Sequence, residues 1–80
     1  MKSDKLLQKL IVGQVQNVAF DDLCLLLRKL GFEHRQKGSH RIFTREGIAE
    51  IINLQPNGKD AKTYQVRQVR EIIERYRLSL

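Results

Sequence analysis

The hydrophobic residues of this 80-residue chain repeat with two different periods, and the change of period separates helices from strands. Near the start of the chain, Leu6, Leu7, Leu10 and Ile11 follow the spacing of one helix face, and Gly13 follows them. Side chains three and four residues apart lie on the same side of a helix, and glycine commonly ends one. The pattern predicts a first amphipathic helix that stops at Gly13.

A second helix is predicted to begin at Phe20 and to end at Gly31, which can adopt the positive φ of a C′ residue. Its apolar stripe follows the i, i+3, i+4, i+7 rule and consists of Phe20, Leu23, Cys24, Leu26, Leu27 and Leu30. Acidic residues occupy its first turn and basic residues its last, which suits the helix dipole at both ends. We expect Cys24, inside this run, to be a buried and unreactive thiol.

After Gly31 the hydrophobic period changes from 3.6 to 2, which is typical of strands. The alternation predicts strands over residues 32–37, 40–45 and 48–54, of which the last is the most apolar and should be the best buried. A turn cluster at residues 55–58 precedes a helix that begins near Thr63, and its apolar stripe is Val66, Val69, Ile72, Ile73 and Tyr76. The order α-α-β-β-β-α indicates an α+β fold in which helices cover one face of a three-stranded antiparallel sheet. We expect a single domain over residues 1–80.

The net charge of +6 is unevenly distributed along the chain. Residues 33–45 carry four basic side chains against one acidic, and residues 59–80 carry six against three. A basic surface on a small domain binds polyanions, most commonly nucleic acid, and the sheet face without helices would offer room for it. Three strands flanked by helices are also the arrangement of a double-stranded-RNA-binding domain. A basic surface that only interacts with solvent is the alternative interpretation.

Three features of the composition bear on where the protein works. One cysteine cannot form an intrachain disulfide, which suits a reducing compartment. No apolar run reaches the roughly 18–20 residues that span a bilayer, and Asp4, Lys5 and Lys9 distinguish the first segment from a signal peptide. We therefore expect a cytoplasmic protein that does not bind membranes.

The segment QKGSHRIF, residues 36–43, carries the chemistry that the sequence suggests. Its His40 is one of two histidines, and together with His34 and Cys24 it matches no zinc spacing, so we predict no metal site. Gly38 and Ser39 do not form a glycine-rich phosphate loop. Adjacent strand residues face opposite sides, which argues against a Ser39–His40 hydrolase pair. We expect His34, which has the parity of the apolar Phe32, to be half-buried.

RNA cleavage needs less from the protein, because the ribose 2′-hydroxyl supplies the nucleophile. A histidine can transfer the proton near neutral pH, which is the role we assign to His40. Lys37 and Arg41 could clamp the phosphate, with Arg35 on the same basic hairpin, and the backbone amides of Gly38 and Ser39 could donate to it. Such a site requires neither a metal nor another cofactor. The alternative is that His40 is a polar surface residue near a turn.

Several of these segments resemble the HicA-type mRNA interferase toxins of bacterial toxin–antitoxin systems. The matching segments are LGF (30–32), QKGSHRIF (36–43), INLQP (52–56) and NGKDAKTYQVRQVREII (57–73). The resemblance implies a double-stranded-RNA-binding-like fold and a metal-independent endoribonuclease that cuts single-stranded or structured mRNA. It places the active-site histidine on His40, preceded by Gly38 and Ser39. It also implies a HicB-type antitoxin partner that covers the active site and usually carries a DNA-binding domain, so that DNA is contacted only through the antitoxin.

The chain departs from the family pattern in three places. Residues 1–19 form an extension before the toxin core of residues 20–80, either to cover apolar surface or to contact a second copy or the antitoxin. Arg41 stands where members often have a second histidine, which leaves the second proton-transfer group unassigned. Thr63 stands where a proline often opens the last helix, and threonine is an acceptable N-cap.

Two other classes of function remain open from the residues alone. A non-catalytic RNA-binding module would keep the basic face without using His40. A protein-interaction domain would direct that face toward an acidic partner.

Overall fold

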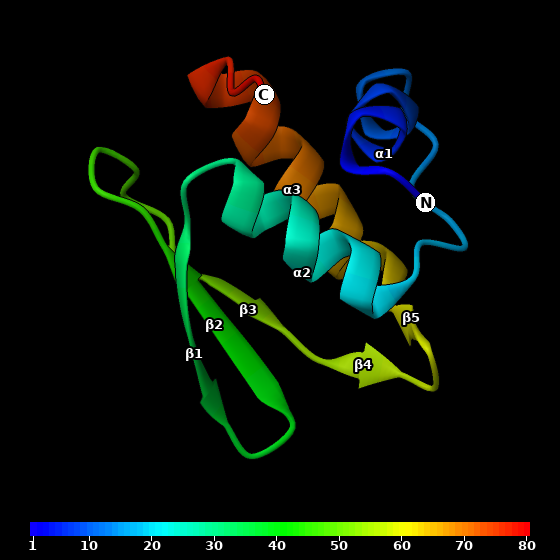
Figure 1. Cartoon of the computed structure of the whole chain (residues 1–80), viewed down its shortest axis with the longest axis vertical. Coiled ribbons are helices and arrows are strands. Elements are labelled where there is room, and N and C mark those ends of the chain that lie inside the picture. Colours follow the sequence, from blue (N-terminus) through cyan, green and yellow to red (C-terminus); the bar gives the residue numbers. More distant parts are fainter.

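The computed structural model describes all residues, 1–80, and confirms the predicted α+β fold with the element order α-α-β-β-β-α. Three helices, a main sheet and a small second hairpin follow one another as α1 (Ser3–Ile11), α2 (Phe20–Lys29), β1 (Glu33–Lys37), β2 (His40–Thr44), β3 (Ile52–Leu54), β4 (Pro56–Asn57), β5 (Asp60–Ala61) and α3 (Thr63–Tyr76). Helices α2 and α3 lie between the three-stranded sheet and α1 (Figure 1). None of the helices has the length and apolar character needed to cross a membrane.

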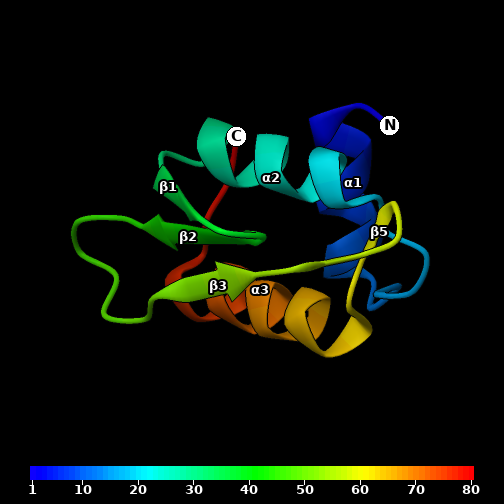
Figure 2. The same ribbon diagram turned by 90° about the horizontal axis from the view of Figure 1, so that it is seen from below.

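The main sheet has the strand order β1-β2-β3, with both neighbouring pairs antiparallel (Figure 2). Phe43 of β2 pairs with Ile52 of β3, and both are fully buried, as is Leu54. These residues define the inner face of the sheet, which packs against α2 and α3. Because side chains alternate along a strand, the outer face carries Glu33, Arg35, Lys37, His40, Ile42, Thr44 and Asn53.

A single hydrophobic cluster of 20 buried residues connects the helices to the inner face. Helix α1 contributes Leu6, Leu7 and Leu10 to it, and Arg70 of α3 donates from Nε to the backbone carbonyl of Leu10 over 2.8 Å. The same carbonyl, in the last turn of α1, also accepts a hydrogen bond from the backbone N–H of Gly13 over 2.9 Å. The N-terminal helix is therefore held by both apolar packing and a polar bond to α3.

The glycine predictions for the two helix ends are confirmed. Gly13 follows α1 with φ of 89°, and Gly31 follows α2 with φ of 94°, in the region that glycine adopts without strain. The side chain of Arg45 donates to the carbonyl of Leu30 over 2.8 Å at the end of α2. These contacts fix the angle at which the chain leaves α2 and enters β1.

The third strand is shorter than predicted. It comprises only Ile52–Leu54, and Ile51 is 62% exposed. The preceding segment is bound to α3, because the Glu50 carboxylate accepts hydrogen bonds from Tyr76 and Arg75. The hydrogen bond from Tyr76 lowers the pKa of Glu50, and the same bond raises the pKa of Tyr76.

Two further predictions about the C-terminal part need correction. The expected turn at residues 55–58 is a hairpin, β4–β5, whose turn lies at Gly58 and Lys59. Thr63 does not cap α3: Lys62 occupies the N-cap position, and Thr63 is the first helical residue. That first helical position is also the one that proline prefers.

A candidate nucleic-acid interface on the outer face of the sheet

The hairpin between β1 and β2 places the candidate residues. Its two-residue turn consists of Gly38 and Ser39, and Lys37 pairs with His40 across it. Gly38 has φ of 62° while Ser39 does not have positive φ, which is the pattern of a type II′ turn with glycine at its first central position. Cross-strand neighbours have Cβ atoms about 4.5–5.5 Å apart, so Lys37 and His40 lie side by side on the outer face.

The imidazole of His40 has a fixed orientation. Its Nδ1 lies 2.9 Å from Oδ1 of Asn53, which is on the neighbouring strand and on the same face. A carboxamide oxygen only accepts hydrogen bonds, so Nδ1 carries the proton and donates it. In the neutral ring the other nitrogen, Nε2, is then the basic one, and it makes no hydrogen bond within the protein.

The structure brings some of the predicted RNA-binding residues together. Arg35, Lys37, Gly38 and Ser39 are exposed, and the two cationic side chains have the outer-face parity of His40. Lys37 therefore lies beside the imidazole, and Arg35, which pairs with Ile42, lies farther along β1 on the same face, which no helix covers. The backbone of the turn is open to solvent as well.

Arg41 does not join this group. It follows His40 directly on β2, so its side chain points to the inner face, and its guanidinium lies 5.8 Å from the centre of the Phe20 ring. This contact is a cation–π interaction at the beginning of α2. The prediction that Arg41 clamps phosphate next to His40 is therefore not supported by its position.

His34 has the inner-face parity that was predicted, but it is exposed and not half-buried. It lies on the edge strand β1, where it borders a surface hollow together with Leu25, Arg28 and Lys29 of α2. Its ring stacks on Phe43 with centroids 5.6 Å apart. The two histidines thus occupy opposite faces of the sheet.

Cys24 is buried, as predicted, and has no disulfide partner. Burial raises the pKa of its thiol to about 11, because the thiolate would lose its hydration among apolar side chains. The thiol therefore stays protonated at neutral pH. The structure contains no group of three or more His, Cys, Asp or Glu side chains arranged to hold a metal ion.

Sequence reasoning missed two residues that support this face, Asn53 and Lys62. Asn53 is an exposed polar residue between the buried Ile52 and Leu54, so period-2 alternation alone could have placed it outside. Lys62 lies eight residues beyond β3, and its Nζ donates to the side chain of Gln55 over 3.2 Å. Only the folded chain brings that lysine to the end of β3.

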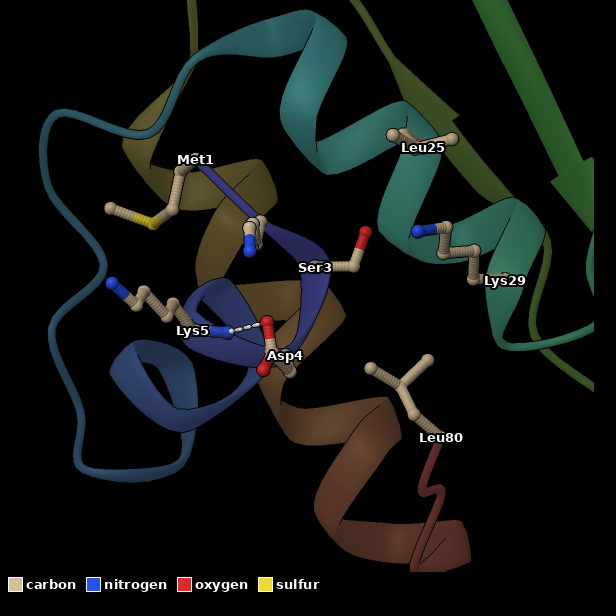
Figure 3. Close-up of a pocket in the computed structure, with 8 residues that line it drawn as sticks. Met1, Ser3, Asp4, Lys5, Leu25, Lys29 and Leu80 are labelled. Carbon is tan, nitrogen blue, oxygen red and sulfur yellow. Dashed lines mark hydrogen bonds between the residues drawn. The ribbon is translucent and has the colours of Figure 1, made fainter.

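The largest hollow on the surface lies elsewhere. It is bordered by the first residues of the chain, by Leu25 and Lys29 of α2, and by Leu80 (Figure 3). None of the residues that line it belongs to the sheet, and the ionisable side chains among them are those of three lysines and Asp4. The candidate interface is thus an exposed face and not a cavity.

Comparison with known proteins bears on what this face does. No curated protein and no solved structure matches the chain. The family described as HicA toxin of bacterial toxin–antitoxin matches over residues 20–74, which include α2, the whole sheet with His40, and most of α3. The match covers more than half of the 80 residues and leaves out α1. The chain therefore belongs to the HicA toxin family of bacterial toxin–antitoxin systems.

Proposed function

We propose that this toxin is an endoribonuclease that cleaves mRNA in the cytoplasm and that His40 transfers the proton. The observation that carries the proposal is the orientation of the imidazole, with Nδ1 donating to Asn53 over 2.9 Å and Nε2 free on the outer face beside Lys37. A base held in one tautomer next to a cation suits an RNA phosphodiester.

The reaction follows from the groups that are present. Nε2 of His40 removes the proton of a ribose 2′-hydroxyl while that oxygen forms a bond to the adjacent phosphorus. The bond from phosphorus to the 5′ oxygen breaks, that oxygen takes a proton from water, and His40 later releases its own proton to solvent. The products are a 2′,3′-cyclic phosphate and a 5′-hydroxyl, and no step requires a metal or other cofactor.

Charge on the phosphoryl oxygens also needs stabilisation. The ammonium group of Lys37 and the backbone amides of Gly38 and Ser39 supply it at the turn, and Arg35 contacts the RNA backbone farther along β1. Lys37 pairs with His40 across the turn, and Arg35 lies on the same face. The positive charge of the hairpin thus serves both binding and catalysis.

The test is cleavage of an mRNA transcript by the purified protein in the presence of EDTA. Wild-type protein should produce fragments that end in a 2′,3′-cyclic phosphate, and a substrate with 2′-deoxyribose at the cleaved position should stay intact. His40→Ala should lower the rate about 100-fold or more, which is the usual contribution of general acid–base catalysis. His34→Ala is the matched control, because it removes the other imidazole from the opposite face.

Each failure has a distinct meaning. If His40→Ala cleaves at the wild-type rate, the proposed site is wrong. If the wild-type protein binds RNA and leaves it intact, it is a non-catalytic RNA-binding module. Absence of any RNA affinity at low salt would indicate a protein-interaction domain.

We further propose a HicB-type antitoxin as the partner, with acidic groups that cover the outer face and with DNA contacted only by the antitoxin. The basic hairpin supports this proposal, since an inhibitor must compete there with a polyanion. Purified antitoxin should abolish cleavage, and it should bind Lys37→Glu less tightly than wild type. Equal affinity for both would place the antitoxin contact elsewhere.

A further inference from the structure

The outer face continues beyond His40 toward α3. Gln55 lies two residues after Asn53 and therefore has the same parity, and the Arg41–Leu54 pair of the register places Gln55 opposite His40. The side-chain oxygen of Gln55 accepts a hydrogen bond from Nζ of Lys62 over 3.2 Å. Gln55 thus places the ammonium group of Lys62, from the N-terminus of α3, next to the His40 region of the sheet.

A second contact fixes the same junction. The backbone N–H of Gln55 donates to Oε1 of the buried Gln65 over 3.0 Å, and Nε2 of Gln65 donates to the hydroxyl of Tyr64 over 3.4 Å. Gln65 therefore connects the end of β3 to the Tyr64 side chain. The first turn of α3 has a defined position relative to His40.

Tyr64 is the unusual member of this group because its side chain is 63% exposed. The other tyrosine, Tyr76, packs against the core and donates to Glu50. The ring of Tyr64 has no aromatic partner in the protein. Exposed aromatic rings and cations together are the groups by which proteins hold single-stranded RNA: the ring stacks on a base and the cation contacts the phosphate.

We propose that Tyr64 and Lys62 form a subsite for one unpaired nucleotide beside the scissile phosphate, with the base on the Tyr64 ring and its phosphate on Lys62. This inference rests on the proposed ribonuclease function and names its substrate class as unpaired RNA. In an A-form duplex the bases are stacked on one another and cannot stack on Tyr64. Segments of mRNA without secondary structure are then the preferred substrates.

Binding without cleavage tests the subsite. The His40→Ala protein and its double variants are titrated into a fluorescent single-stranded RNA and into the matching duplex. The RNA has about 20 nucleotides, which is longer than one binding site of ~4–16 nucleotides. Tyr64→Leu should weaken single-strand binding about tenfold and leave duplex binding unchanged, whereas Tyr64→Phe should keep wild-type affinity, since stacking requires only the ring.

Lysine variants test the phosphate contact. Lys62→Ala should lower the slope of log affinity against log salt by about 0.7 for the single strand, which corresponds to one lost phosphate contact. Lys29→Ala is the matched control, because that exposed lysine lies at the end of α2, beside the hollow of Figure 3. It should leave the slope unchanged.

Two results would overturn the subsite: unchanged single-strand affinity in Tyr64→Leu, or an equal loss on single strand and duplex. Neither depends on cleavage, so they are distinct from failure of the proposed function. Persistent cleavage by His40→Ala would refute the catalytic assignment, while the affinity of Tyr64→Leu would still decide the subsite.

Discussion

The two faces of the sheet are formed by the same strands, yet they differ in almost every physical property. On the inner face, Phe43, Ile52 and Leu54 are fully buried against α2 and α3. On the outer face, Lys37 and Asn53 are exposed and His40 is partly exposed. Alternation along each strand produces this separation, since successive side chains point to opposite sides.

This difference shows that successive residues of one strand serve different roles: inner-face residues stabilise the fold, and outer-face residues are available for binding and proton transfer. Burial on the inner face drives folding, because apolar area is removed from water there. The outer face contributes little burial and is therefore free to carry charge and an imidazole. A substitution should then affect either the free energy of unfolding or the cleavage rate, according to its parity.

The largest expected effect is on the inner face. Phe43→Ala should lower the free energy of unfolding by about 3–5 kcal/mol, because it removes a fully buried ring and leaves a cavity. Ile42→Ala, one residue earlier and on the outer face, should lower the free energy of unfolding by less than about 1 kcal/mol, because this side chain buries less apolar area. Urea denaturation of both variants measures the difference. Equal losses would contradict the division between the faces, and Phe43→Leu provides a milder inner-face variant if Phe43→Ala does not fold.

Residue parity explains how much of the site could be predicted from the sequence. The outer position of His40 follows from alternation, and the extent of α2 follows from its apolar stripe and from Gly31. The prediction for Arg41 gave charge more weight than parity, and parity places its side chain on the face opposite His40. His34 was expected to be half-buried because it shares the parity of Phe32. Parity predicts which face of the sheet a residue occupies, but it does not predict how deeply the side chain is buried there.

Other features depend on contacts between distant segments and could not be read from local patterns. The bond from His40 to Asn53 joins residues 13 apart and depends on the register of β2 with β3. The segment before the short third strand is bound through Glu50 to Tyr76, 26 residues away. Register and long-range hydrogen bonds are fixed by tertiary packing, which no local period encodes.

The second largest effect should come from Asn53, a positioning residue on the outer face. Asn53→Leu removes the acceptor of His40 Nδ1, so the ring can rotate or change tautomer, and kcat should fall about 10–100-fold, as for loss of a group that orients a histidine. KM should stay within about twofold, since the RNA contacts of Lys37 and the turn are retained. Steady-state cleavage kinetics measure both.

Asn53→Asp separates orientation from packing. The carboxylate still accepts the Nδ1 proton, so kcat should recover, and its negative charge should move the rising limb of the pH–rate profile to higher pH by favouring the imidazolium. A merely structural role for Asn53 would leave that limb in place. Identical pH profiles for wild type and Asn53→Asp would therefore count against the positioning role.

A smaller effect, on the pH dependence of the free energy of unfolding, should come from Cys24, a buried residue of α2 in the hydrophobic cluster. Burial raises the pKa of its thiol from 9.0 to about 11. The folded state thus binds more protons than the unfolded state between these values, so this contribution to stability is complete below pH 9 and is lost as the pH rises toward 11. From pH 8 to 10 the loss amounts to about 1 kcal/mol.

Cys24→Ala should remove that part of the pH dependence. Urea denaturation at pH 8 and pH 10, with reductant, should show the wild-type protein losing about 1 kcal/mol more than the variant. Tyr76 and all other titrating groups are present in both proteins, so the comparison isolates the thiol. Parallel losses in the two proteins would show that the thiol is not desolvated in the folded state.

The smallest effect should come from Arg41, the one cation of the hairpin strands that points inward. Arg41→Gln removes the cation–π contact with Phe20 and should cost about 0.5–1 kcal/mol of stability. Its effect on RNA affinity should stay within about twofold at physiological salt, where charges more than ~8 Å away are largely screened. Lys37→Gln makes the same change in charge on the outer face and should reduce both the affinity and its salt dependence. If Arg41→Gln weakened RNA binding as much as Lys37→Gln, the inner face would also contact RNA. The two faces would then not differ in RNA binding, which contradicts the division of roles between them.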